Sequence, residues 1–182
     1  MQGAGTPDYG IVRELAYGVA LAALPTTLAY HTLGQFIGAP IRMTEIDAAA
    51  LTEWSNHWHN FLRGHGGWDW SRIATYYRIM RDDSFEVAIW HDTTLCGLAA
   101  GMGPRYGRVE VDLIEGSWDR HHPLKGAVRY AVMEAAKAYA VSLGLDELRL
   151  NYPAPGLLTK YEQMGFTLNP PYHPYCWMKV TP

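Results

Sequence analysis

Four side chains in the sequence have the chemistry that proton transfer needs. Tyr161 stands four residues before Gly165 in the segment LTKYEQMGF, so a helix there would project its hydroxyl toward neighbouring strands, where a phenol can serve as an acid. The carboxylates of Glu110, Asp112 and Glu115 lie in the segment RVEVDLIEG and are available as proton acceptors. Because strand side chains alternate, we expect Glu110 and Asp112 on one face and Glu115 on the other. A packing tyrosine and solvated or ion-paired carboxylates are the structural alternatives.

A second chemical signal is the segment HHPLKGAV, residues 121–128, which leads into a long predicted helix. The first amides of a helix have no partner within it and, together with the helix dipole, favour an anion. Here those amides belong to Lys125, Gly126, Ala127 and Val128. Lys125 adds a positive charge. The segment therefore predicts an anion site, and the alternative is an ordinary loop with a solvated lysine.

Composition places the chain among folded globular proteins of one domain, with room for an appendage. Of its 182 residues, 48% are apolar and 18% are charged. Fifteen Lys and Arg against eighteen Asp and Glu leave a net charge of -3, which provides no basic field for a nucleic acid. Cys96 and Cys176 belong to no CxxC pair, so we expect neither a disulfide framework nor a zinc finger, and a cytoplasmic location. His57 and His59 would point to different faces of a helix, so we predict no metal.

The amino-terminal region has no charged residue from residue 15 to residue 41. Its length would suffice for a membrane span, but Pro25 and several polar side chains interrupt the apolar run. No signal peptide is visible at the start. We therefore expect no membrane association, but helices packed on the domain or on a second subunit. One helix should run from Glu14 to Leu24, with a break at Pro25 and a shorter helix ending near Gly38.

Strands and helices alternate in the rest of the chain. After a strand at residues 41–46, Asp47 is a good N-cap for a helix that reaches about Leu62, and another helix follows over residues 71–80. Three strands that form an antiparallel meander come next, at residues 84–90, 95–102 and 108–116.

The pattern then changes to a strand–helix–strand unit. A long, almost uncharged helix over residues 126–144 ends at Gly144 and leads to a strand at residues 146–152. Such a unit places its two strands parallel and adjacent. The chain closes with a helix and two strands, at residues 155–164, 166–168 and 175–180.

This order of elements resembles the GNAT superfamily of acetyl-CoA-dependent N-acetyltransferases. The segment LTKYEQMGF, residues 158–166, is similar to the family's LYEKxGF signature in the last helix, and it follows a long helix and an Asn-bearing strand as the family requires. The resemblance covers about residues 40–182. It implies an α+β fold of three layers (α/β/α), with a mixed, mostly antiparallel sheet that contains one parallel strand pair. Residues 1–39 would form a helical N-terminal extension to the acyltransferase domain.

The resemblance also implies a donor and a set of site residues. Acetyl-CoA would be the acyl donor, and Tyr161 would protonate the leaving thiolate. Glu110, or secondly Glu115, would assist deprotonation of the attacking amine. The residues implied in donor binding are Leu113, Ile114, Lys125, Gly126, Ala127, Val128 and Asn151. The family's pyrophosphate loop, Q/R-x-x-G-x-G/A, is degenerate here, because HHPLKGAV matches it in neither register of Gly126.

In this family the first two helices and the final hairpin shape the acceptor pocket, and both regions are rich in aromatic residues here. The residues implied in acceptor binding are Trp58, Trp68, Trp70 and Tyr172. The expected function is transfer of an acetyl or longer acyl group to a primary amine by direct attack. The alternative is a non-catalytic binding module that acts through its N-terminal helices and aromatic-rich face. A homodimer would form through those helices or the sheet edge.

Overall fold

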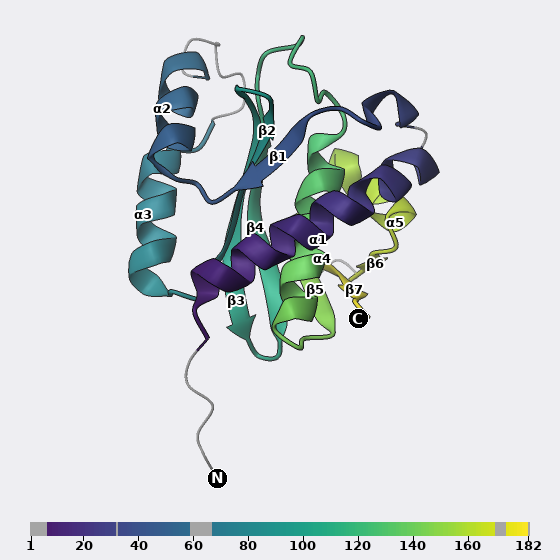
Figure 1. The fold of residues 1–182 in the computed structure, drawn as a ribbon. Coiled ribbons are helices and arrows are strands. Elements are labelled where there is room, and N and C mark those ends of the chain that lie inside the picture. Colours follow the sequence, from purple (N-terminus) through teal and green to yellow (C-terminus); the bar gives the residue numbers. More distant parts are fainter. Residues whose placement is uncertain (1–6, 32, 59–66, 170–173, 182) are drawn as a thin grey trace.

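We describe the fold from a computed structural model, which places residues 7–31, 33–58, 67–169 and 174–181. Within these ranges a seven-stranded sheet has the order β1-β2-β3-β4-β5-β7-β6 and carries helices on both faces (Figure 1). The strands are β1 Ile41–Thr44, β2 Phe85–His91, β3 Thr94–Arg105, β4 Arg108–Gly116, β5 Glu147–Asn151, β6 Thr167–Leu168 and β7 Tyr175–Lys179. The helices are α1 Tyr9–Tyr30, α2 Ala48–His57, α3 Trp70–Met80, α4 Val128–Ser142 and α5 Leu158–Gln163.

Only the β4–β5 pair is parallel, and the other strand pairs of the described sheet are antiparallel. The parallel pair flanks α4, as expected of a strand–helix–strand unit. One hydrophobic core lies between the sheet and the helices α1, α4 and α5, and a second lies between the sheet and the helices α2 and α3. The predicted α+β fold of three layers, with a mixed and mostly antiparallel sheet, is therefore confirmed.

Several helix ends follow from local chemistry. The Asp47 carboxylate accepts a hydrogen bond from the Ala50 amide at 2.8 Å and begins α2, as predicted. The α2 helix ends at His57, and the predicted end near Leu62 lies outside the described residues. Gly144, just beyond α4, has a φ of +70°, a conformation that glycine adopts without steric cost.

The α1 helix differs from the prediction, because it continues through Pro25 as one helix of 22 residues. A proline in a helix interior removes one backbone hydrogen bond. Here Pro25 lies on the exposed side, where water can hydrate the carbonyl that is left without a donor. Leu24 and Leu28, on either side of the proline, stay in the buried face that packs on α4. Packing therefore outweighs the local break, and the predicted second helix is only a 3-10 turn at Gly34–Phe36.

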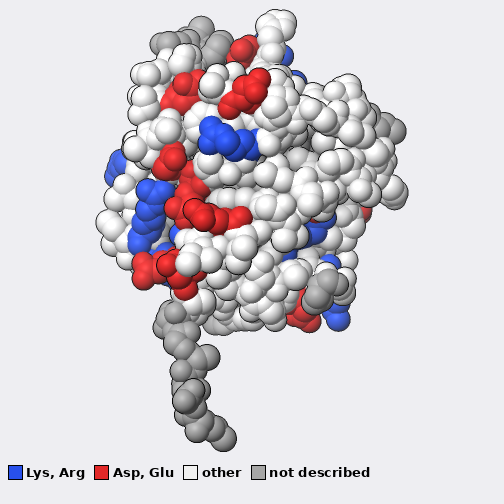
Figure 2. Space-filling view, viewed as in Figure 1, with Lys and Arg blue, Asp and Glu red and all other residues white. Residues whose placement is uncertain are grey.

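The exposed side of α1 is apolar as well. By length and composition α1 is the one described helix that could cross a membrane, although its buried face belongs to the core of the domain. Its exposed side presents Ile11, Leu15 and Val19 at four-residue intervals. Figure 2 shows few charged side chains around the end of α1, whereas acidic side chains gather near its beginning.

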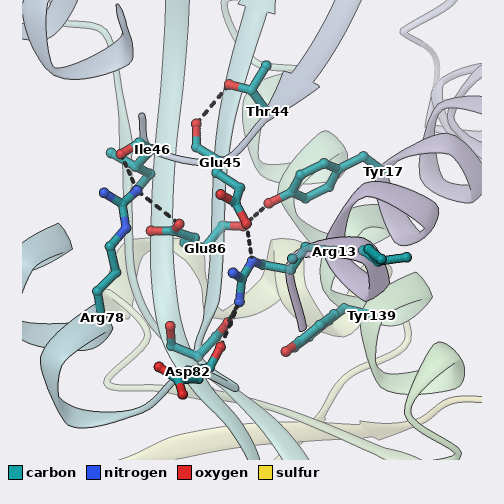
Figure 3. Close-up of polar contacts among 12 residues, drawn as sticks. Arg13, Tyr17, Thr44, Glu45, Ile46, Arg78, Asp82, Glu86 and Tyr139 are labelled. Atoms are coloured by element: carbon teal, nitrogen blue, oxygen red, sulfur yellow. Dashed lines mark hydrogen bonds and ion pairs between the residues drawn. The ribbon is translucent and has the colours of Figure 1, made fainter. Parts of the chain in front are cut away.

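Polar contacts fasten the beginning of α1 to the sheet (Figure 3). The Arg13 guanidinium donates to the Glu45 carboxylate at 2.6 Å and to the carbonyl oxygens of Asp82 and Ser84 at 3.0 Å each. The Tyr17 hydroxyl donates to the carbonyl oxygen of Glu86 at 2.5 Å. These contacts join α1 to segments far away in the sequence.

Arg13→Ala is expected to lower the free energy of unfolding by about 2 to 3 kcal/mol, because it leaves two carbonyl groups and one carboxylate without their donor. Urea denaturation monitored by circular dichroism measures the change. Glu14→Ala, an exposed position of the same helix, is the matched control and should change stability by less than about 0.5 kcal/mol. Equal effects of the two substitutions would show that the Arg13 contacts do not hold α1.

Candidate functional site

The strands β4 and β5 separate near the middle of the sheet. Their register runs from Val109 opposite Leu148 to Val111 opposite Leu150, and β4 then continues to Gly116 without β5. An opening between two neighbouring strands is where a ligand can pass between the two faces of a sheet. The following paragraphs describe the side chains around this opening.

An irregularity in β4 lies at the same place. Leu113 pairs with Ala100 and Val111 pairs with Gly101, so Asp112 is an extra residue on β4, which defines a β-bulge. The bulge needs a close approach of the two strands, because an added Cβ on Gly101 would lie 1.9 Å from the carbonyl oxygen of Glu110. Glycine is thus the residue that allows β4 this path.

The bulge overturns the predicted orientation of Glu115, because an extra residue reverses the alternation beyond it. Glu115 lies on the same face as Asp112, and both accept hydrogen bonds from α3. Glu115 accepts from the indole N–H of Trp70 at 2.5 Å, and its other oxygen accepts from that of Trp118 at 2.7 Å. Asp112 accepts from the Tyr77 hydroxyl at 2.8 Å. Glu115 is therefore buried and held by two indole rings.

A cavity of about 290 Å³ lies on the opposite face, where the end of β4 meets the start of α4 and the α5 helix. It is lined by Ile114, Gly116, Ser117, His122, Lys125, Gly126, Val128, Arg129, Leu157 and Tyr161. Two of these described lining residues, Lys125 and Arg129, are cationic and none is acidic. We name it the basic cavity. Its charge and its place at a helix N-terminus favour an anion.

Two buried nitrogen atoms in the wall of the basic cavity lack hydrogen-bond partners. These atoms are Nδ1 of His122 and Nε of Arg129. Burial and the Lys125 charge lower the pKa of His122, so its imidazole is neutral near pH 7. Buried polar groups normally have partners, so these two nitrogen atoms are available to hydrogen-bond a ligand in the basic cavity.

The loop before α4 offers fewer free amides than predicted. The Lys125 amide donates to the carbonyl oxygen of His122 at 3.2 Å, and the Ala127 amide donates to that of Leu124 at 2.9 Å. In the described chain no such backbone bond engages the amides of Gly126 and Val128. Gly126 has a φ of +90°, a conformation that other residues rarely adopt, and α4 begins two residues later than predicted. Two of the four predicted amides are therefore available.

Tyr161 lies in the wall of the basic cavity, on α5. Burial raises its pKa to about 12, because the phenolate is disfavoured in apolar surroundings. Its ring packs edge-on against Phe166, with ring centroids 5.9 Å apart. The hydroxyl is therefore protonated near pH 7, and Tyr161 lines the same cavity as the cationic residues Lys125 and Arg129.

The other predicted donor-site and base residues lie on the α3 face of the sheet. The Asn151 side-chain amide donates to Glu110 at 3.0 Å and to Asp112 at 2.7 Å. Glu110 also accepts from Arg108 at 2.6 Å. Leu113 faces α3 as well. The structure therefore joins Ile114, Lys125, Gly126 and Val128 with Tyr161 around one cavity. Ala127 is buried beside that cavity, and Leu113, Asn151, Glu110 and Glu115 lie on the other face.

Three of the predicted acceptor residues lie in the described chain. Trp58 and Trp70 are buried, and the Trp58 indole donates to the Leu95 carbonyl oxygen at 3.3 Å, so both rings build the core under α2 and α3. Trp68 is exposed and packs edge-on against Trp70 at 6.1 Å between ring centroids. Tyr172 lies outside the described residues.

Arg129 escaped the sequence analysis, whereas His122 belongs to the segment HHPLKGAV that predicted the anion site. Arg129 lies in the first turn of α4, where a cation is unfavourable beside the positive end of the helix dipole. An anion bound at this helix N-terminus would explain why a cation stands there. His122 carried no sequence signal for burial. No group of three or more His, Cys, Asp or Glu in the described ranges is arranged to hold a metal ion.

Acetyltransferases of known structure share this fold. Ard1 from Thermoplasma volcanium superimposes with a TM-score of 0.58 and 13% identity, over 79% of this chain and 99% of that one. PaiA N-acetyltransferase from Thermoplasma acidophilum, solved in complex with coenzyme A, has a TM-score of 0.54 and 16% identity, over 78% and 99% of the two chains. An acetyltransferase of the GNAT family from Staphylococcus aureus Mu50 has a TM-score of 0.56 and 9% identity, over 78% and 99%.

No family model matches the sequence, and no curated protein matches it. At these identities the structural likeness establishes the fold, which is that of GNAT acetyltransferases, as the sequence resemblance implied.

Proposed function

We propose that the protein is an acyl-CoA-dependent N-acyltransferase that moves an acetyl group from acetyl-CoA to a primary amine. The basic cavity is the observation that carries this proposal. It contains the cations Lys125 and Arg129, two buried nitrogen atoms without hydrogen-bond partners, and the protonated hydroxyl of Tyr161. It lies where β4 and β5 separate. Acetyltransferases with the same fold include one solved in complex with coenzyme A, which supports the choice of donor.

The two ends of such a donor would contact different parts of the basic cavity. Lys125, Arg129 and the free amide of Gly126 would bind phosphate oxygens, since charge-assisted hydrogen bonds to such oxygens are strong. Ile114 and Leu157 offer apolar surface for the pantetheine arm, beside Tyr161. The thioester would then reach the opening between β4 and β5.

The reaction is a direct attack of the amine nitrogen on the thioester carbonyl carbon. A C–N bond forms and the C–S bond breaks, and the Tyr161 hydroxyl gives its proton to the leaving thiolate. The ammonium of the acceptor must first lose a proton, which Glu110 would accept, with Glu115 as the second choice. After the attack the nitrogen loses a second proton, which restores the Tyr161 hydroxyl. The reaction therefore releases one proton overall, the one that the carboxylate accepted from the ammonium.

Saturating acetyl-CoA is expected to raise the melting temperature of the protein by roughly 5 to 10 °C, because a ligand at 100 times its dissociation constant stabilises the folded state by about 2.7 kcal/mol. Differential scanning fluorimetry measures this shift. Arg129→Ala should remove most of it, because Arg129 lines the basic cavity.

The matched control is Arg42→Ala, an exposed arginine on β1 whose guanidinium lies over the Trp90 ring. It should leave the shift unchanged. The donor assignment would be wrong if neither acetyl-CoA nor coenzyme A moved the melting temperature of the wild-type protein.

The second candidate function is a non-catalytic binding module, which the exposed apolar stripe of Ile11, Leu15 and Val19 favours. Their exposed fractions are 57%, 63% and 57%, although each is a large apolar side chain. Acetyl-CoA binding without turnover of any amine would support this alternative.

A further inference from the structure

His122 lies between two cavities. It lines the basic cavity and also a second cavity of about 370 Å³, which is bounded by the end of α2, the start of β3 and the loop after β4. Only 5% of the residue is exposed, and in the described chain its Nδ1 atom has no hydrogen-bond partner. Because buried polar atoms normally have partners, this imidazole is available to hydrogen-bond a ligand of the basic cavity.

The two cavities carry opposite charge. The basic cavity contains the cations Lys125 and Arg129. The second cavity contains the carboxylates of Glu53 and Asp119 and, among its described lining residues, no lysine or arginine. We name the second cavity the acidic hollow. Because His122 lines both cavities, the cations disfavour a protonated imidazole while the carboxylates favour it.

This balance of charge decides the protonation of His122. Burial and the Lys125 charge lower its pKa, and the Asp119 charge opposes them. A phosphate group bound at Lys125 and Arg129 would offset both cations and add negative charge to the same cavity. The pKa of His122 would then rise, so that a proton binds near pH 7. The titratable or charged side chains that line the two cavities in the described ranges are Glu53, His57, Asp119, His122, Lys125, Arg129 and Tyr161.

We propose that His122 is a third anion-binding residue of the basic cavity. It takes up a proton from solvent when the phosphate groups of the donor bind, and it returns this proton when they leave. Its Nδ1–H would donate to a phosphate oxygen, while Glu53 and Asp119 stabilise the charge of the imidazolium. The affinity for the donor therefore falls as the pH rises through the neutral range. This inference rests on the proposed function, which assigns the phosphate end of the donor to the basic cavity.

The test counts the protons that the full chain exchanges when it binds dephospho-coenzyme A. This probe lacks the phosphate monoester of coenzyme A, a group that itself titrates at about pH 6. Isothermal titration calorimetry at pH 7, in buffers of different ionisation enthalpy, gives the number of protons. We expect an uptake of about 0.5 to 1 proton per ligand, and an affinity at least about three-fold higher at pH 6.5 than at pH 8. Binding without proton uptake would overturn the proposal.

His122→Gln keeps a hydrogen-bond donor at this place but cannot take up the proton. It should abolish the proton uptake and the pH dependence, and it should leave the affinity at pH 8 within about three-fold of the wild type. His57→Gln is the matched control, because His57 lines the acidic hollow but not the basic cavity, and its side chain is 64% exposed. It should leave the proton uptake unchanged. Equal losses in the two variants would overturn the role of His122.

Asp119→Asn keeps the inference testable if His122→Gln fails to fold. The oxygen of the new amide can still accept the hydrogen bond that the His121 amide donates to Asp119 at 2.8 Å. The variant removes one carboxylate of the acidic hollow and should lower the proton uptake at pH 7 by about half or more. Unchanged uptake would overturn the stabilisation of the imidazolium by the acidic hollow.

Coenzyme A separates this inference from the proposed function. A normal shift of the melting temperature with coenzyme A, together with binding of dephospho-coenzyme A without proton uptake, would overturn this inference and leave the proposed function intact. If only coenzyme A binds, its proton uptake is compared between the wild type and His122→Gln, and equal values overturn the inference. No binding of either ligand would overturn both.

Discussion

Tyr161→Phe is expected to lower kcat for acyl transfer by about 10²- to 10³-fold, the usual contribution of a positioned general acid. The substitution removes only the hydroxyl, so the buried ring and its contact with Phe166 remain. Without this proton donor the thiolate must leave unprotonated. The affinity for acetyl-CoA should stay within about two-fold, because the phosphate end of the donor would bind at Lys125 and Arg129.

The pH dependence adds a second readout for this residue. Because the pKa of Tyr161 is about 12, its hydroxyl is protonated throughout the range from pH 6 to pH 10. The wild-type rate should therefore show no alkaline loss of the acid below about pH 10. The rate is followed as free thiol released from acetyl-CoA in the presence of a panel of primary amines.

Tyr152→Phe is the matched control, since Tyr152 is an exposed tyrosine just beyond β5 and lies outside the basic cavity. It should retain full kcat. If Tyr161→Phe kept more than about a third of the wild-type kcat, Tyr161 would be a packing residue and not the acid.

Gly101→Ala is expected to lower the free energy of unfolding by more than about 4 kcal/mol, a loss large enough to prevent folding. The added Cβ would lie 1.9 Å from the Glu110 carbonyl oxygen and 2.8 Å from the Val111 Cα. Both are backbone atoms of β4, so relief would require the strand itself to move. That movement would remove the bulge at Asp112 and the opening between β4 and β5.

Urea denaturation of Gly101→Ala, with circular dichroism as the probe, measures the loss. Gly116→Ala is the matched control in the same sheet, because the nearest atom to its added Cβ is 3.9 Å away. It should change stability by less than about 1 kcal/mol. If Gly101→Ala lowered the free energy of unfolding no more than Gly116→Ala does, β4 would be able to form the bulge without a glycine at position 101.

Local signals explain why much of the fold could be predicted. The Asp47 cap, the Gly144 helix end and the parallel β4–β5 pair each depend on residues close together in the sequence. The position of Tyr161 followed from the motif LTKYEQMGF. Such features are decided by backbone chemistry within one element or one strand–helix–strand unit.

The continuity of α1 could not be predicted in this way. Pro25 is a strong local signal for a helix break. The side chains that overrule it, Leu24 and Leu28, gain their packing from α4, a helix about a hundred residues later in the chain. The local rule therefore gives the cost of a proline in a helix correctly, but it does not include the packing against α4 that outweighs this cost.

The sequence by itself determined the order of the elements and the place of Tyr161 in the last helix, and it predicted a helix N-terminus at Gly126, two residues before α4 begins. Only the tertiary structure decided which carboxylates face α3, because the bulge at Asp112 arises from the contact of β4 with Gly101 of another strand. The hydrogen bonds of Asp112 and the orphaned nitrogen of Arg129 likewise depend on neighbours from other elements. Register, burial and the pairing of charges are relations between distant segments, and a pattern within one segment does not contain them.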